Sequence, residues 1–294
     1  MRPSSRSVHG PSFGRRPAGQ PGDTFGSGYP GPARSRLGLW LRYAAMRAKV
    51  RLAYRGDFAL HALGDLLVAG IAIVFLVSLF SHIPHIRGWS FPEILFLWGM
   101  GEVSTGLFFV LFQGLWALNQ QYLLRGEMDR VLLRPLDPYG QIMVDHLNLE
   151  DLPIVLLGLA MIGWALPGLP AFSLAQWLLL PLFLLCGVLV LAGTLTLFSC
   201  LGFLIHHRGT AIGVVYQASA FNRYPLDIFP RPLQRLLTFV LPFAFIAFFP
   251  ASWYLGRTEW LLGAAVQPLV GVGLFVGARW LWGRALRRYR SPGS

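Results

Sequence analysis

The sequence predicts an all-α polytopic membrane protein, on the evidence of its composition, its long apolar runs and the placement of its basic residues. Hydrophobic residues make up 54% of the 294 residues and charged residues only 13%, with a mean hydropathy of +0.53. Soluble domains carry about 25% charged residues. The net charge of +12 does not indicate a nucleic-acid partner, because the basic residues lie before the first apolar run and at the ends of the others. The composition therefore predicts a lipid bilayer as the partner.

A membrane-spanning helix needs about 20 predominantly apolar residues, and the sequence offers six such runs before topology is considered. They are residues 58–80, 91–116, 152–169, 177–205, 209–221 and 260–282. Pro92 and Pro153 suit the first turns of their helices. The fourth run exceeds the bilayer thickness and must tilt or project into water, whereas the fifth is barely long enough to cross.

A seventh apolar run, residues 236–255, is broken by Pro242 and Pro250. If this run crosses the membrane, the arginines after residue 282 lie on the opposite side from the basic residues before residue 58. The excess of Lys and Arg on cytoplasmic segments favours six crossings instead, with both termini cytoplasmic and residues 236–255 re-entrant. A re-entrant segment is tolerated where protein surrounds it. Seven crossings remain the alternative, and four arginines flank the re-entrant run on the outer side against the rule: Arg223, Arg231, Arg235 and Arg257.

The connector between the second and third runs, "LLRGEMDRVLLRPLDP" at residues 123–138, balances three arginines against three acids. Met128, Val131 and Leu132 have the spacing of a short apolar helical face, and Glu127 and Arg130 are spaced to pair across one turn. Pro135 must end this helix. A helix that rests on anionic lipid carries an excess of positive charge, whereas mixed charges around an apolar centre favour a protein partner.

The motif "RGEMDRVLLRPLDP" resembles the cytoplasmic motif of ATP-binding-cassette (ABC) transporter permeases of the type-2 exporter class. A second segment, "YPLDIFPRPLQRLLTFVLPFAFIAFFPASWYLGR" at residues 224–257, is similar to the proline-rich segment of the same subgroup. The similarity extends from about residue 36 onward. It implies six transmembrane helices, a cytoplasmic coupling helix between helices two and three, and a re-entrant helical hairpin before helix six.

The resemblance also implies partners and site residues. Residues 126–136 would dock on a separate ABC ATPase, with contacts from Arg125, Gly126, Glu127, Asp129, Arg130, Leu133, Arg134 and Pro135. The hairpin would be marked by Pro225, Asp227, Pro242 and Pro250. A second permease chain would complete a homodimer or a heterodimer in the cell membrane. The expected layout is a disordered tail at residues 1–35, an interfacial amphipathic helix at 36–56 and a permease domain at 57–290.

ATP hydrolysis is expected from another subunit. A P-loop requires a lysine within a glycine-rich GxxxxGK motif, and the only lysine in the chain is Lys49, in "RAKVR". ATP and Mg²⁺ are therefore expected on the ATPase, and no cofactor on this chain.

Two rival functions remain open. A membrane-embedded enzyme is disfavoured because no GxSxG or HExxH motif occurs, and no catalytic site or metal site is predicted. An ion-coupled carrier would use Glu102, which lies near the middle of the second run, and the weaker candidate Asp65. The alternative role for Glu102 is a hydrogen-bonding brace between helices, beside small residues that allow close packing. Cys186 and Cys200 are expected as buried free thiols.

Overall fold

The computed structural model describes residues 55–123, 127–134, 136–205, 210–259 and 265–287, together with Gly38, Ala45 and Met46. The chain divides into two units, Met1–Leu39 and Trp40–Ser294, and the description below concerns the second. The expected tail at residues 1–35 lies outside the described residues, as does most of the expected interfacial helix at 36–56.

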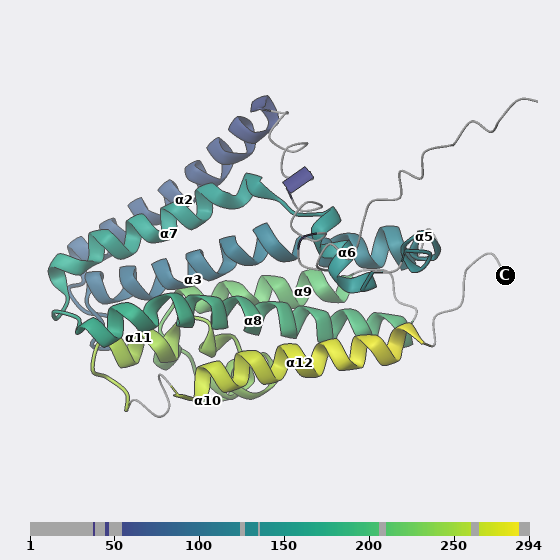
Figure 1. Cartoon of the computed structure of the whole chain (residues 1–294). Coiled ribbons are helices and arrows are strands. Elements are labelled where there is room, and N and C mark those ends of the chain that lie inside the picture. The colour runs from purple at the N-terminus through teal and green to yellow at the C-terminus, as the bar shows by residue number, and fades with distance from the viewer. Residues whose placement is uncertain are drawn as a thin grey trace, which may run out of the picture. The chain divides into compact units, whose positions relative to one another are not determined.

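The described part of this unit is helical, with no strand and a single isolated bridge between Ile86 and Trp89. Five helices are long and apolar enough to cross a membrane: α2 (Arg55–His82), α3 (Phe91–Phe112), α7 (Leu152–Ala165, extended by 3₁₀ turns at both ends), α8 (Leu174–Ile205) and α12 (Val266–Leu286). Helix α3 packs against α7 and α8, α8 packs against α12, and α2 lies along α7 (Figure 1). The prediction of an all-α polytopic membrane fold is confirmed.

The bundle has two ends, which are named here by the segments that lie there. The connector end holds residues 118–151, with the π-helical turn η1 (Leu118–Leu123), α5 (Met128–Leu132) and α6 (Pro138–Asp145). The short helix α4 (Gly114–Ala117) leads from α3 to this end. The loop end holds residues 83–90 and 166–173, where the ring of Phe91 lies 5.7 Å from that of Trp164. Figure 1 shows α5 and α6 at one end of the bundle and α11 toward the other.

The fifth crossing is broken rather than a continuous helix. Helix α9 (Thr210–Ser219) has ten residues and spans about 15 Å, which is too short to cross alone. The 3₁₀ turn η4 (Ala220–Arg223) continues it to the depth of Glu102, about half way along α3. Tyr224 is then extended, with φ −120° and ψ 147°, because a residue before proline avoids helical geometry.

The chain completes this crossing through η5 (Leu226–Ile228), and at the loop end Trp89 Nε1 donates to Asp227 Oδ2 over 2.9 Å. The chain therefore passes between the two ends six times, as predicted. The expectation of one apolar run over residues 209–221 is wrong in detail, because the α-helix ends at Ser219 and the crossing extends to Ile228. The expectation that Arg223 lies outside the bundle is also wrong, because Arg223 contacts Glu102.

The run predicted to be re-entrant enters and leaves at the loop end. It contains α10 (Arg231–Arg235), the π-helical turn η6 (Leu236–Val240), η7 (Phe243–Phe245) and α11 (Phe248–Tyr254), and its two halves meet at 76°. Pro242 lies at this bend and Pro250 lies in the first turn of α11. The segment reaches mid-bundle, where a Cβ added to Gly187 of α8 would lie 3.0 Å from the carbonyl oxygen of Ile246.

Helix α11 then returns to the loop end, where the Tyr254 hydroxyl donates to the carbonyl oxygen of Gln176 at the start of α8. Because both ends of the run contact the loop end, the six-crossing arrangement holds and the seven-crossing alternative does not.

A carboxylate at the start of α3 anchors the exit of the hairpin. Arg257 Nη2 lies 2.7 Å from Glu93 Oε1 and 2.8 Å from Oε2, and it also donates to the carbonyl oxygen of Gly88 over 2.7 Å. The same carboxylate accepts from the backbone N–H of Ser90, which closes a capping box on α3. Arg257, an apparent exception to the charge rule, is thus explained by a local partner.

Helices α3 and α7 cross closely because glycine faces glycine. A Cβ on Gly158 would lie 2.7 Å from the backbone nitrogen of Val103 and 2.8 Å from the carbonyl oxygen of Gly99. Small residues at such contacts let membrane helices pack through their backbones. The predicted role of the small residues around Glu102 is confirmed at this crossing. Cys186 and Cys200 are buried free thiols, as expected.

This crossing generates a prediction with a control on the same helix. Gly158→Leu should lower the melting temperature of the detergent-solubilised protein, with a loss of about 1–3 kcal/mol, because backbone atoms of α3 cannot yield as a flexible side chain does. Gly163→Leu should be neutral or stabilising, because no atom lies within 4 Å of its added Cβ and leucine favours helix over glycine. The melting temperatures of both variants are measured by thermal unfolding, in which the loss of folded protein is monitored by size-exclusion chromatography. Equal melting temperatures would contradict the close crossing.

Candidate functional site

The connector helix α5 presents apolar residues on two sides. Met128 and Val131 are 0% and 5% exposed and belong to the hydrophobic cluster beneath the connector. Leu132 and Leu133 are 46% and 86% exposed. The helix has five residues, and Leu132 is exposed although it was predicted to share one apolar face with the buried Met128 and Val131. An exposed leucine pair among charged residues is suited to a groove on another protein.

The charged residues of the connector surround this leucine pair. Asp129 and Arg130 are exposed on α5, and Arg134 Nη1 lies 4.0 Å from Asp145 Oδ2. The predicted side-chain pair of Glu127 and Arg130 is wrong within the described part of the connector, where these residues are joined by a backbone hydrogen bond from Arg130 N to Glu127 O. Three predicted contact residues lie outside the described residues: Arg125, Gly126 and Pro135.

An arginine of the last crossing holds the second half of the connector. Arg279 Nη2, on α12, lies 3.0 Å from both carboxylate oxygens of Asp137. The guanidinium carbon lies 4.1 Å from the centroid of the Tyr139 ring, within cation–π range. Asp137 also caps α6, because its Oδ2 accepts from the N–H of Gly140 over 2.8 Å. One carboxylate therefore starts α6 and ties it to α12.

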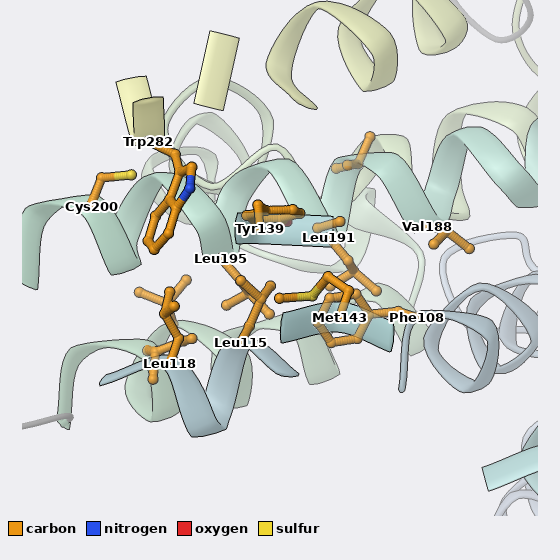
Figure 2. Close-up of a cluster of buried hydrophobic side chains, with 14 of the residues drawn as sticks. Phe108, Leu115, Leu118, Tyr139, Met143, Val188, Leu191, Leu195, Cys200 and Trp282 are labelled. Carbon is orange, nitrogen blue, oxygen red and sulfur yellow. The ribbon is translucent and has the colours of Figure 1, made fainter. Parts of the chain in front are cut away.

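The side chain of Tyr139 packs the connector against the core of the bundle. Its ring is 3% exposed and lies 5.8 Å from that of Trp282, and its hydroxyl is 2.8 Å from Thr196 Oγ1 on α8. Figure 2 shows Tyr139 beside Leu191 and Leu195, in a cluster built from α3, α4, α6, α8 and α12. The connector is thus packed against the ends of three crossings.

A second polar site lies half way through the bundle. Glu102 is 7% exposed, and its Oε1 accepts from Trp98 Nε1 over 2.6 Å and lies 2.8 Å from Arg223 Nε. An ionised carboxylate at this depth is costly unless it is paired. The pair joins α3 to the end of η4, as a brace between helices requires.

A cavity of about 330 Å³ opens beside this ion pair, between α2, α3, α7 and α9. Trp98, Glu102, Phe109 and Gln113 line it from one face of α3, and Asp65 lines it from α2. The two candidate polar residues named from the sequence therefore line the same cavity, from different helices. A second cavity of about 330 Å³ lies beside Thr105 and Gln217 and shares Tyr216 and Arg223 with the first.

Sequence reasoning missed Arg223, Tyr139 and Arg279 as functional residues. Arg223 could have been identified from the sequence, because a glutamate within an apolar run requires a cationic partner. Arg223 was also one of the arginines placed on the outer side, where the charge rule does not predict them. Arg279 lay inside the run at residues 260–282 and had a similar signal. Tyr139 had none, because a tyrosine after a proline turn is common.

The fold and these sites define a membrane transport protein: crossing helices, a re-entrant hairpin at one end, a polar connector at the other, and polar cavities between. The chain belongs to the family described as ABC-2 family transporter protein, whose model matches residues 66–293. Comparisons with curated proteins and with solved structures found no match. Membership makes the chain a multi-pass permease of an ABC-type transporter, which associates with an ABC ATPase.

The buried ion pair generates a prediction about stability. Arg223→Gln leaves the Glu102 carboxylate with Trp98 as its donor and should lower the free energy of unfolding. Breaking a fully buried pair costs about 3–5 kcal/mol, and because the Arg223 side chain is 39% exposed we expect about 1–3 kcal/mol. Arg231→Gln, an exposed arginine of α10, is the matched control and should leave stability unchanged.

A double-mutant cycle separates the pair from its surroundings. Glu102→Gln combined with Arg223→Gln should be more stable than the sum of the two single losses predicts, because neither charge is then left alone. Strictly additive losses would show that the two side chains do not interact.

Proposed function

We propose that this chain is the permease subunit of an ABC exporter, in which a separate ATPase docks on the connector and drives alternating access. The observation that carries the proposal is the exposed pair Leu132 and Leu133 on a helix with charges of both signs. ATP and Mg²⁺ would be held by the ATPase. The connector end would then be cytoplasmic, together with both chain termini. The direction of transport follows the exporter class that the sequence resembles.

A second permease chain would complete the pathway. Only 6% of the α2 span is buried, against 78% of the α3 span, so α2 leaves most of its surface to lipid or to another chain. Six crossings enclose little space at their own centre, and a homodimer or heterodimer would place a pathway between two bundles.

The ion pair weighs against an ion-coupled carrier centred on Glu102. A carrier's coupling site must be open to its ion as the protein moves, whereas Arg223 already holds the Glu102 carboxylate at a distance of 2.8 Å. The contacts of Glu102 support the brace.

Charge reversal in the connector tests the docking proposal. Glu127→Lys with Asp129→Lys should abolish co-purification of the ATPase from the native membrane, because like charges at close contacts cost up to several kcal/mol. Membrane insertion should persist, since added lysines at a cytoplasmic surface are tolerated. Affinity purification followed by mass spectrometry measures both.

The control for this variant is Glu259→Lys, a reversal on the exposed loop after α11, which should retain the ATPase. A connector that rests on lipid predicts the opposite result, because each added lysine strengthens attraction to anionic lipid by about 1 kcal/mol. Undiminished recovery of the ATPase with the connector variant would overturn the docking assignment.

The contact between Arg279 and Asp137 should carry motion from the connector to α12. Arg279→Gln should leave the ATPase bound but weaken the ATP-dependent change in amide hydrogen exchange along α12, because it removes the charged contact of the connector with that helix and leaves the ring contacts of Tyr139 with Phe275 and Trp282. Arg284→Gln, an exposed arginine of the same helix, should behave as the parent. Hydrogen exchange of the reconstituted complex with and without ATP measures this. An unchanged α12 response in Arg279→Gln would show that the contact carries no motion.

A further inference from the structure

Two of the four arginines that go against the charge rule have no partner that would explain them. Arg223 and Arg257 each pair with a glutamate of α3. Arg231 and Arg235 are both exposed on α10, and no ion pair joins either of them to an acid among the described residues. Two cations that the described chain does not neutralise are available to an anion from outside it.

Helix α10 and the turn η6 are held against the bundle by one face. Leu237 is 2% exposed and belongs to the hydrophobic core, and Leu233, one turn earlier, packs against the same cluster. Gln234 Nε2 also donates to the carbonyl oxygen of Phe229 over 2.8 Å, which ties the helix to the chain before it. The opposite face, which carries the two arginines, is therefore fixed toward the surroundings of the bundle.

The two arginines are spaced to hold one phosphate group together. Residues four apart on a helix lie on the same face, with Cβ atoms about 5–6 Å apart. Each guanidinium presents a planar fork of N–H donors that matches two phosphate oxygens. Arg231 and Arg235 begin and end α10, and Pro232 restricts the backbone between them. The pair therefore offers several donors at a fixed separation.

The apolar surface beside the arginines indicates that the anion belongs to a lipid. Phe239 and Val240 of η6 are 82% and 61% exposed, and Leu236 is 40% exposed. These residues lie between α10 and the bend at Pro242, so they continue from the loop end toward the middle of the bundle. A dissolved anion would contact only the guanidiniums, whereas a phospholipid also covers the apolar side chains with its acyl chains.

The net charge of the headgroup decides which phospholipid is favoured. Phosphatidylcholine and phosphatidylglycerol carry the same phosphate, but choline places a positive charge near it, and this charge repels the arginines. A headgroup with a net negative charge lacks that repulsion. Each basic residue at a membrane surface favours anionic lipid, and α10 places two of them within about one turn.

We propose that the outward face of α10 and η6 binds one anionic phospholipid, whose phosphate lies between Arg231 and Arg235 and whose acyl chain lies along Phe239 and Val240. The lipid supplies the negative charge that a glutamate supplies to each of the other two arginines. The proposal goes beyond the transport function and requires neither the ATPase nor a substrate, so its failure would leave the exporter assignment unchanged.

The test measures which lipid lies next to η6 in the full chain. Val240→Cys is labelled with a bimane fluorophore, because Cys186 and Cys200 are buried. The protein is placed in phosphatidylcholine nanodiscs that contain the same small fraction of either dibrominated phosphatidylglycerol or dibrominated phosphatidylcholine. Bromine quenches nearby fluorophores, and quenching by phosphatidylglycerol should be greater by about 3-fold or more. A label at Leu178→Cys, exposed on the uncharged helix α8, should show no preference.

Substitution of the arginines identifies the site. Arg231→Gln with Arg235→Gln should remove the preference for phosphatidylglycerol at position 240. The control, Arg284→Gln with Arg287→Gln, changes two exposed arginines at the C-terminal end of α12 and should retain the preference. Inorganic phosphate in excess over the brominated lipid should leave the preference of the unsubstituted arginines in place, because it offers nothing to the apolar residues.

Four outcomes would overturn the proposal. The first is equal quenching by the two lipids at position 240, and the second is a preference of the same size at position 178, which would show general attraction to a basic protein. The third is loss of the preference when inorganic phosphate is added, and the fourth is a preference that survives in the double glutamine variant. The first three leave both arginines in place, so they remain decisive if that variant does not fold.

Discussion

The placement of one carboxylate at mid-membrane depth constrains much of this fold. Glu102 lies on a helix whose span is otherwise apolar, and its cationic partner comes from another crossing. Because Arg223 must reach that depth, the fifth crossing cannot be an uninterrupted apolar helix. It changes from α9 to a 3₁₀ turn at Ala220 and becomes extended at Tyr224, where Pro225 excludes helical geometry.

A broken crossing exposes backbone groups that the bilayer cannot satisfy, so protein must surround the break. The hairpin supplies part of this cover. Asn222, at the break, lies against Gly101, and Ala247 at the hairpin tip lies on the same glycine. The break in the fifth crossing and the re-entrant hairpin therefore depend on each other, because each irregular segment is shielded from lipid by the other and by α3. The anchor of Glu93 on Arg257 then fixes the hairpin exit at the loop end.

The sequence predicted the architecture because its signals are physical constraints that act over long distances. Apolar length located α2, α3, α7, α8 and α12, and the balance of arginines at the two ends decided between six and seven crossings. The sites were less predictable. The spacing of Glu127 and Arg130 permits a side-chain pair on any helix, but the contact found between them in the described part of the connector is the backbone hydrogen bond from Arg130 N to Glu127 O. Tertiary partners such as Asp137 with Arg279 are separated by more than a hundred residues, and spacing along the chain carries no information about them.

The connector contacts helices that line the cavity or pack against the helices that line it. A partner bound to the connector could therefore act on the cavity through these helices. A Cβ on Gly114 of α4 would lie 2.6 Å from the carbonyl oxygen of Ile142, so the backbones of α4 and α6 are in direct contact. Helix α4 continues α3, whose cavity-lining face ends at Gln113, and Arg279 links the same connector to α12. At the other end α3 is held by Arg257 and α8 by Tyr254. A helix held at one end and displaced at the other must tilt about the held end, and the cavity lining lies between those points. If the ATPase docks on the connector as proposed, displacement of the connector would therefore change the space beside Glu102 without any direct contact between the ATPase and the cavity.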